Sequence, residues 1–167
     1  NSKKIYKQKN NIDSFDVVIR INITPKKKYY SKVGKRCDII MLSNSPARLL
    51  MKDTIKVWTV PFNTNFINHI PLHKKLYKNY QLYHFRNDWW QELYNQIGAR
   101  PSAGASSLHF LVKLLKRPDI TLFGFEHKKG NAWYAELPKQ QDSHDYNAEK
   151  KYFRSLVGNN IRYADEF

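Results

Sequence analysis

The sequence predicts an α/β fold in which a largely parallel sheet is covered by helices on both faces. Three observations predict it. Short apolar runs typical of strands alternate with segments whose apolar residues recur at helical spacing. The length of 167 residues suits one domain with its own core. No internal repeat, low-complexity tract or apolar run of membrane-spanning length interrupts this alternation. We therefore expect a single domain over residues 1–167.

Four apolar runs are the predicted strands, at residues 17–22, 37–42, 55–62 and 120–125. The first, VVIRIN, is closed by Thr24 and Pro25, and the second, CDIIML, follows a lysine-rich loop and Gly34. The last, ITLFGF, is a continuous apolar run. Continuous short runs of this kind are typical of strands buried on both faces of a parallel sheet.

Two helices are predicted between the third and fourth strands. The first has Asn87 or Asp88 as its expected N-cap and ends at Gly98, with aromatic and aliphatic residues at helical spacing between them. The second follows a turn-forming loop of small residues, 101–104. Its apolar face, at the i, i+3, i+4, i+7 positions, consists of Leu108, Leu111, Val112 and Leu115.

The most prominent bulk property is the net charge of +15, from 29 lysines and arginines against 14 acidic residues. Such a charge attracts nucleic acid, an acidic membrane leaflet, or phosphorylated and carboxylated small molecules, and does not distinguish among them. The lysines cluster at residues 3–9, 26–28 and 73–78. Cys37 is the only cysteine, which excludes an intramolecular disulfide and favours a reducing compartment.

Candidate ligand-binding residues follow from the predicted sheet, because ligands of such sheets bind beyond the carboxyl ends of the strands. Asn22 closes the first strand, and Gly124 and Phe125 close the last. The loop PSAGASS at 101–107 opens a helix, so its backbone N–H groups and the Ser102 hydroxyl can approach an anion. A capped loop without a ligand would have the same sequence.

Common cofactor and metal motifs are absent from the chain. It contains no P-loop, GxGxxG, HExxH or CxxC pattern, and no DxD pair of the kind that holds a divalent metal beside a nucleotide sugar. A divalent-metal site for a nucleotide sugar therefore lacks its usual carboxylates.

The stretch HDYNAEKK at 144–151 opens a third predicted helix, for which Asp142 or Ser143 is the expected N-cap. This assignment puts His144 in the first helical turn, where the helix dipole disfavours a protonated imidazole. A neutral histidine is a candidate general base. An exposed first-turn histidine without a role is the alternative.

Taken in order, four segments resemble the sialylmotifs of the animal-type sialyltransferase family. Each motif is weak by itself, but four in the family's order are specific, and together they span nearly the whole chain. Asn1 and Ser2 resemble the end of the turn that precedes the large motif, so the first strand is expected upstream. The large, small, third and very small motifs are matched by residues 13–38, 100–125, 130–136 and 144–149.

The resemblance implies a Rossmann-like, GT-A-like domain that transfers sialic acid from CMP-sialic acid to a hydroxyl of an acceptor glycan. The resemblance also implies that the transfer is inverting, that it needs no metal or other cofactor, and that His144 is its general base. Glu149 is implied to be structural, tying down its helix. The residues implied to bind the donor are Asn1, Asn22, Ser102, Ala103, Gly104, Gly124 and Phe125.

The chain departs from the family at several positions. Ala103 replaces a hydroxyl residue, and Trp133 stands where a histidine often precedes the tyrosine, here Tyr134. We expect Trp133, Tyr134, His127 and Lys150 on the phosphate or acceptor side. The cysteine pair of the secretory-pathway enzymes is absent. A bacterial, cytoplasmic relative or one domain of a larger glycosyltransferase fits this better. Peripheral attachment to the inner membrane face is an open alternative for its location.

Three alternatives stay open. The donor is CMP-sialic acid or CMP-Kdo, since both are CMP esters of 2-keto acid sugars, and Kdo would place the enzyme in capsule or lipopolysaccharide synthesis. The lysine clusters could contact anionic lipid that displays a glycolipid acceptor. A basic, non-enzymatic nucleic-acid binder is the rival class, although no nucleic-acid-binding module is present and no such partner is expected.

Overall fold

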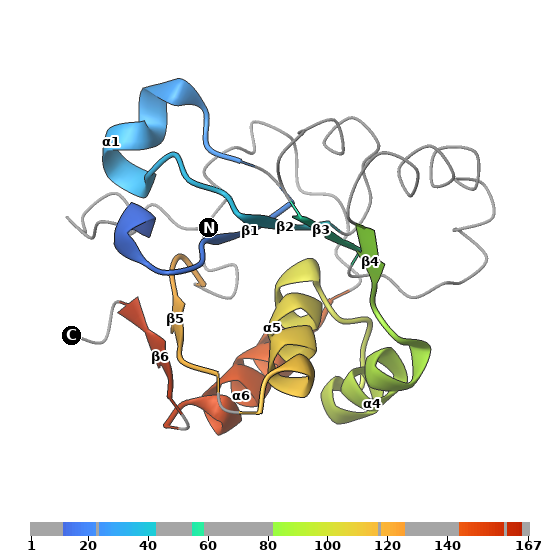
Figure 1. Cartoon of the computed structure of the whole chain (residues 1–167). Coiled ribbons are helices and arrows are strands. Elements are labelled where there is room, and N and C mark those ends of the chain that lie inside the picture. The colour runs from blue at the N-terminus through green and yellow to red at the C-terminus, as the bar shows by residue number, and fades with distance from the viewer. Residues whose placement is uncertain are drawn as a thin grey trace.

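The computed structural model describes residues 12–22, 24–42, 55–58, 82–116, 118–125, 144–158 and 160–164 (Figure 1). In chain order the N-terminal elements are η2 (Ile12–Ser14), β1 (Ile19–Ile21), η3 (Lys27–Tyr29), α1 (Tyr30–Val33), β2 (Ile39–Leu42) and β3 (Ile55–Trp58). They are followed by β4 (Leu82–His84), α4 (Asn87–Ile97), α5 (Ala103–Leu114), β5 (Ile120–Leu122), α6 (Tyr146–Leu156) and β6 (Ile161–Tyr163). Asn1 lies outside the described residues, as does the expected upstream strand.

The main sheet has four strands in the order β1-β2-β3-β4, and every neighbouring pair is parallel. Ile39 of β2 pairs with Ile19 of β1 on one side and with Ile55 of β3 on the other. The predicted parallel α/β fold is therefore confirmed, and it contains a fourth strand, β4, that the sequence patterns did not predict.

The last predicted strand differs from the expectation. It ends at Leu122 rather than Phe125, and β5 pairs in parallel with β6 in a separate two-stranded sheet. Gly124 has a φ of 73°, in the left-handed region, so the chain turns there instead of continuing as a strand. Gly124 and Phe125 therefore lie in the turn after β5.

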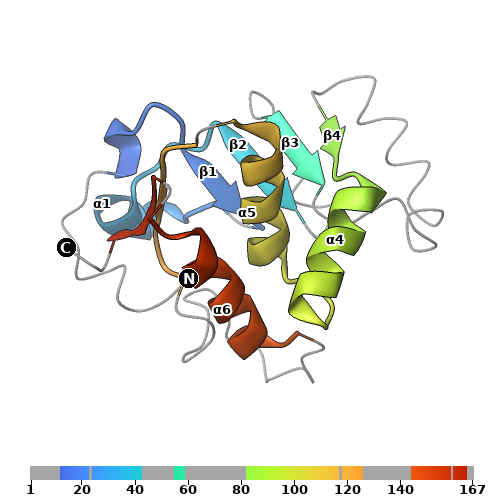
Figure 2. The same cartoon turned by 90° about the horizontal axis from the view of Figure 1, so that it is seen from below.

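Helices α4, α5 and α6 lie together on one face of the main sheet, and α1 lies beyond the β1 edge (Figures 1 and 2). Whether helices also cover the other face stays a prediction, because the described residues do not test it. The main core joins the three helices to β5 and β6, and its buried residues are Leu93, Ile97, Ala105, Leu108, Leu122, Phe153 and Ile161. Within the described residues, no helix is long and apolar enough to cross a membrane.

Two helix boundaries correct the sequence-based expectations. α4 begins at Asn87 after Arg86, whose side chain makes no capping bond, so neither Asn87 nor Asp88 is the N-cap. Its predicted end at Gly98 is confirmed, with a φ of 73°. α6 begins at Tyr146, and its N-cap is Asp145 rather than Asp142 or Ser143.

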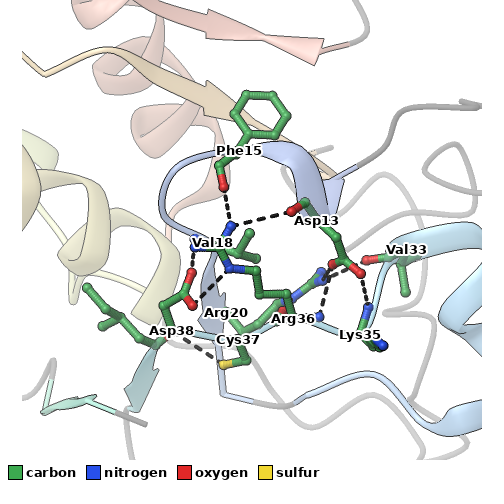
Figure 3. A network of polar contacts seen from close by, with 10 residues as sticks. Asp13, Phe15, Val18, Arg20, Val33, Lys35, Arg36, Cys37 and Asp38 are labelled. Carbon is green, nitrogen blue, oxygen red and sulfur yellow. Dashed lines mark hydrogen bonds and ion pairs between the residues drawn. The ribbon is translucent and has the colours of Figure 1, made fainter.

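A polar network secures the start of β1 to the loop between α1 and β2 (Figure 3). The Asp13 carboxylate accepts hydrogen bonds from the backbone N–H groups of Lys35 and Arg36, both at 2.9 Å. The Asp38 carboxylate accepts from the Val18 N–H at 2.6 Å and from the Arg36 guanidinium at 3.0 Å. Arg36 also donates to the carbonyls of residues 13, 15 and 16, and thereby stabilises the segment that leads into β1.

Candidate active site

The loop before α5 is held by a carboxylate from α6. Ser102 is the N-cap of α5, and its Oγ accepts a hydrogen bond from the Ala105 N–H at 3.2 Å. Glu149 accepts from the Ser102 N–H at 2.6 Å through Oε1 and from the Ser102 hydroxyl at 2.8 Å through Oε2. Only 2% of Glu149 is exposed to solvent. The paired bonds join two segments 47 residues apart in the sequence.

This arrangement determines which hydrogen-bond donors at the start of α5 can bind an anion. The Ser102 hydroxyl proton and backbone N–H are both donated to Glu149, so neither is directed at a ligand. The backbone N–H groups of Ala103 and Gly104 are in the first turn, where helix geometry provides no intrahelical acceptor. They are therefore the groups of this helix end that are suited to a phosphate or carboxylate.

Gly104 lies against the aromatic ring of Phe125. A Cβ atom on Gly104 would lie 3.0 Å from Cε1 of Phe125 and 3.5 Å from Oγ of Ser102. The Phe125 ring packs in turn on Phe153 of α6, with ring centroids 5.1 Å apart. The structure thus brings Ser102, Gly104 and Phe125 together, and the absence of a side chain at Gly104 is what permits the contact.

His144 lies just before the N-cap of α6, not in its first turn as predicted. Asp145 caps the helix by accepting from the N–H groups of Asn147 at 3.0 Å and Ala148 at 2.9 Å. The Nδ1 atom of His144 is 2.7 Å from the backbone carbonyl oxygen of Arg100. Because a carbonyl only accepts hydrogen bonds, Nδ1 carries the proton, and the basic lone pair of the neutral ring is on Nε2.

Asn22 follows β1 at the carboxyl end of the sheet. It has a φ of 62°, in the left-handed region, and its N–H donates to the Met41 carbonyl at 2.7 Å. Helix α5 packs on both β1 and β2. Asn22 therefore turns the chain at the end of a strand that supports α5, which is the position that the ligand-binding prediction requires.

A model of glycosyltransferase family 29 (sialyltransferase) matches residues 6–70, which include the predicted large motif. The crystal structure of a mammalian sialyltransferase superposes with a TM-score of 0.70 and 22% sequence identity, over 96% of this chain and 64% of the solved chain. The chain has a sialyltransferase fold.

A second structure agrees with this assignment. It is a mammalian sialyltransferase in complex with Gal-beta-1-3GalNAc-ortho-nitrophenol, and it superposes with a TM-score of 0.68 and 20% identity over the same shares of the two chains. No curated protein matches the sequence. The resemblance to the animal-type sialyltransferase family is confirmed, and the chain spans about two thirds of the length of the solved sialyltransferases.

The remaining predicted site residues have different outcomes within the sialyltransferase fold. Lys150 is half-buried on α6, next to Glu149. Asn1, His127, Trp133 and Tyr134 lie outside the described residues, so their roles stay predictions. Among the residues that the structure does describe, no group of three or more His, Cys, Asp or Glu side chains could hold a metal ion.

Sequence reasoning missed two features of the site. Asp145 stands immediately before the first periodic apolar residue, Tyr146, and this is the ordinary signal for an N-cap. The polar side chains of Asp142 and Ser143 have the same capping chemistry and come earlier in the chain, so the local sequence does not distinguish them from Asp145. The Arg100 carbonyl has no sequence signal, because every residue carries one.

Proposed function

We propose that this chain forms part of a glycosyltransferase that moves sialic acid from CMP-sialic acid to a hydroxyl group of an acceptor glycan. The fold and the family match support the reaction class. The observation that carries the mechanism is the 2.7 Å contact between Nδ1 of His144 and the Arg100 carbonyl, which leaves a basic Nε2 on the ring. The same loop continues into Ser102, Ala103 and Gly104 at the start of α5.

The proposed step is a single displacement. The acceptor hydroxyl oxygen attacks the anomeric carbon of the donor sugar as the bond from that carbon to the CMP phosphate oxygen breaks. Nε2 of His144 takes the hydroxyl proton, and CMP leaves as an anion. The Ala103 and Gly104 N–H groups at the positive end of α5 stabilise the departing phosphate without a metal ion. One bond forms as one breaks on the opposite side, so the anomeric configuration inverts.

Glu149 is proposed to be a positioning residue in this mechanism. Its carboxylate is buried and bound to Ser102, so it has no oxygen directed at a reacting hydroxyl. It fixes the start of α6 against the loop that holds the donor.

The test is CMP release with CMP-N-acetylneuraminic acid and CMP-Kdo as parallel donors and Gal-β1-3GalNAc among the acceptors. His144→Gln retains the side-chain volume and His144→Asn places an amide donor near the position of Nδ1 for the Arg100 carbonyl. Neither side chain has a basic nitrogen, so transfer should fall at least 100-fold in both variants. Lys151→Ala, on an exposed face of α6, is the matched control. Undiminished transfer by His144→Gln would refute the base. Turnover with CMP-Kdo alone would replace the proposed donor.

We also propose a lipid contact for the surface of η3 and α1. Five exposed lysines on and around η3 and α1 form what we call the basic surface: Lys26, Lys27, Lys28, Lys32 and Lys35. No acidic residue occurs between Asp16 and Asp38. Lysines near an anionic bilayer contribute about 1 kcal/mol each, so this surface suffices for a peripheral contact with a membrane that displays a glycolipid acceptor.

Flotation with vesicles tests the lipid contact. The protein should float with phosphatidylcholine vesicles that contain phosphatidylglycerol and not with phosphatidylcholine alone. Replacing Lys26, Lys27 and Lys28 together by glutamine should abolish flotation while donor turnover is retained. Flotation that does not depend on the phosphatidylglycerol content would overturn the proposed contact with an anionic membrane. Tight binding to nucleic acid at moderate salt would overturn it as well.

A further inference from the structure

A buried polar pair joins the middle of α5 to α6. Nδ1 of His109 on α5 lies 2.7 Å from the hydroxyl oxygen of Tyr152 on α6, and the two ring centroids are 5.9 Å apart. His109 is 2% exposed, and the ring of Phe85 packs edge-on against it. A polar contact in such apolar surroundings is unusual, since leucine and phenylalanine at these positions would fill the space without a desolvation cost.

The groups around the pair keep it uncharged near neutral pH. Burial lowers the pKa of His109, opposed by the negative charge of Glu92, and burial raises the pKa of Tyr152. Glu92 of α4 and Lys113 of α5 form an ion pair of 2.6 Å, so their charges largely cancel beside the ring. Nε2 of His109 is buried and has no hydrogen-bond partner among the described residues. The nearby Trp89 backbone raises the pKa of His109, but burial has the larger effect and lowers it.

Among the described residues, the pair is a second polar contact along the same helix interface. The first, Ser102 to Glu149, lies at the start of α5. Tyr152 follows Glu149 by three residues, and therefore lies on the same face of α6 about one turn later. Apolar packing tolerates small sliding movements, whereas directional hydrogen bonds at two points one turn apart fix both the rotation and the axial register of α6 on α5.

The register of α6 matters because the helix follows His144 after a single residue, Asp145. A displacement of the helix start would move the His144 ring relative to the Arg100 carbonyl and the donor loop. Misplacement of a reacting group by about 1 Å can cost about 100-fold in rate. A contact that fixes α6 therefore acts on the reaction without touching the substrate.

We infer that His109 and Tyr152 are positioning residues, whose hydrogen bond holds α6 in the register that aims His144 at the acceptor hydroxyl. This inference rests on the proposed function. Neither side chain contacts a reacting atom, and the pair acts through His144 alone. Loss of the bond should therefore reduce the rate of the chemical step and leave donor binding nearly unchanged.

The first experiment removes one oxygen atom. Tyr152→Phe should lower kcat about 10-fold and change the KM for the CMP-sugar less than twofold, at a temperature where circular dichroism shows a folded protein. Tyr94→Phe, at an exposed tyrosine of α4, is the matched control and should change neither constant. Unchanged kcat in Tyr152→Phe would overturn the inference.

Two further variants separate positioning from a general loss of structure. His109→Asn places an amide near the position of Nδ1 and should restore most of the kcat that His109→Leu loses. In a His144→Gln background, Tyr152→Phe should reduce the residual rate less than twofold, because the residue through which it acts is already gone. A full 10-fold loss in that background would overturn the inference.

The same measurements distinguish failure of the proposed function from failure of the positioning role. A wild-type protein that turns over neither donor would overturn the proposed function and the positioning role with it. An active wild type whose Tyr152→Phe and His109→Leu variants are equally active would overturn the positioning role alone.

Discussion

Replacing Glu149 by alanine should remove both hydrogen bonds that hold the start of α5 to α6. Hydrogen bonds to a charged acceptor contribute about 1.5–3 kcal/mol each, and a carboxylate at a helix N-terminus adds roughly 0.3–1 kcal/mol. Relief of the cost of burying the carboxylate offsets part of this loss. We therefore expect Glu149→Ala to lower the free energy of unfolding by about 2–4 kcal/mol, a large part of the typical total of about 5–15 kcal/mol.

Glutamine at the same position should cause a smaller loss. Its carbonyl oxygen can accept from the Ser102 N–H at the position of Oε1, and its amide can donate to the Ser102 Oγ at the position of Oε2. Both bonds are then between neutral groups and contribute about 1 kcal/mol each. The loss for Glu149→Gln should be about 1–2 kcal/mol, midway between wild type and Glu149→Ala.

Urea unfolding followed by circular dichroism measures these differences, provided that the slopes of the transitions agree. Lys151→Ala, an exposed residue two positions along the same helix, is the control and should lie within about 0.5 kcal/mol of wild type. A double-mutant cycle of Ser102→Ala with Glu149→Gln should give a coupling of roughly 0.5–3 kcal/mol. Equal stabilities of the glutamine and alanine variants, or additive effects in the cycle, would refute the reasoning.

Three other perturbations have defined outcomes. Gly104→Ala forces the Phe125 ring away from a Cβ only 3.0 Å distant, and should cost about 1 kcal/mol and weaken CMP binding severalfold in a titration; a more stable variant would contradict it. Arg36→Lys cannot reproduce the guanidinium contacts, and should lower the thermal midpoint by several degrees, about 1–2 kcal/mol for this part-exposed side chain. Burial raises the pKa of Asp13 and of Asp38, but hydrogen bonds from backbone N–H groups stabilise both carboxylates. The net effect is a pKa below the usual value at each residue. The two carboxylates should therefore add to the free energy of unfolding at neutral pH, and this contribution should be lost as the pH falls below about 4. Unfolding measured at pH 7 and 3.5 should show a smaller loss of stability in Asp13→Asn than in wild type.

Local patterns in the sequence determined the elements whose signals are local. The apolar runs at β1, β2 and β3 predicted parallel strands, and Gly98 predicted the end of α4, because only a residue without a side chain readily adopts the left-handed conformation there. The motif order also predicted the sialyltransferase fold. Each of these features depends on spacing within a few residues or on the order of segments along the chain.

The tertiary structure decided which of several equivalent local choices is used. Asp142, Ser143 and Asp145 can all cap a helix, and the structure uses Asp145, which places His144 outside the first turn. The apolar run at β5 suited the main sheet equally well, but it pairs with β6 in a second sheet. Short strand and cap signals do not specify their partners, so packing makes the choice.

The contacts that define the candidate site join residues far apart in the chain. Ser102 and Glu149 are separated by 47 positions, and His109 and Tyr152 by 43. The sequence by itself determined that Ser102 opens the predicted helix that contains His109, and that Glu149 and Tyr152 lie three residues apart on another. Only the folded packing of α5 on α6 decided that these residues meet in pairs, because the pairing of two helix faces depends on their relative rotation and register, which no local pattern encodes.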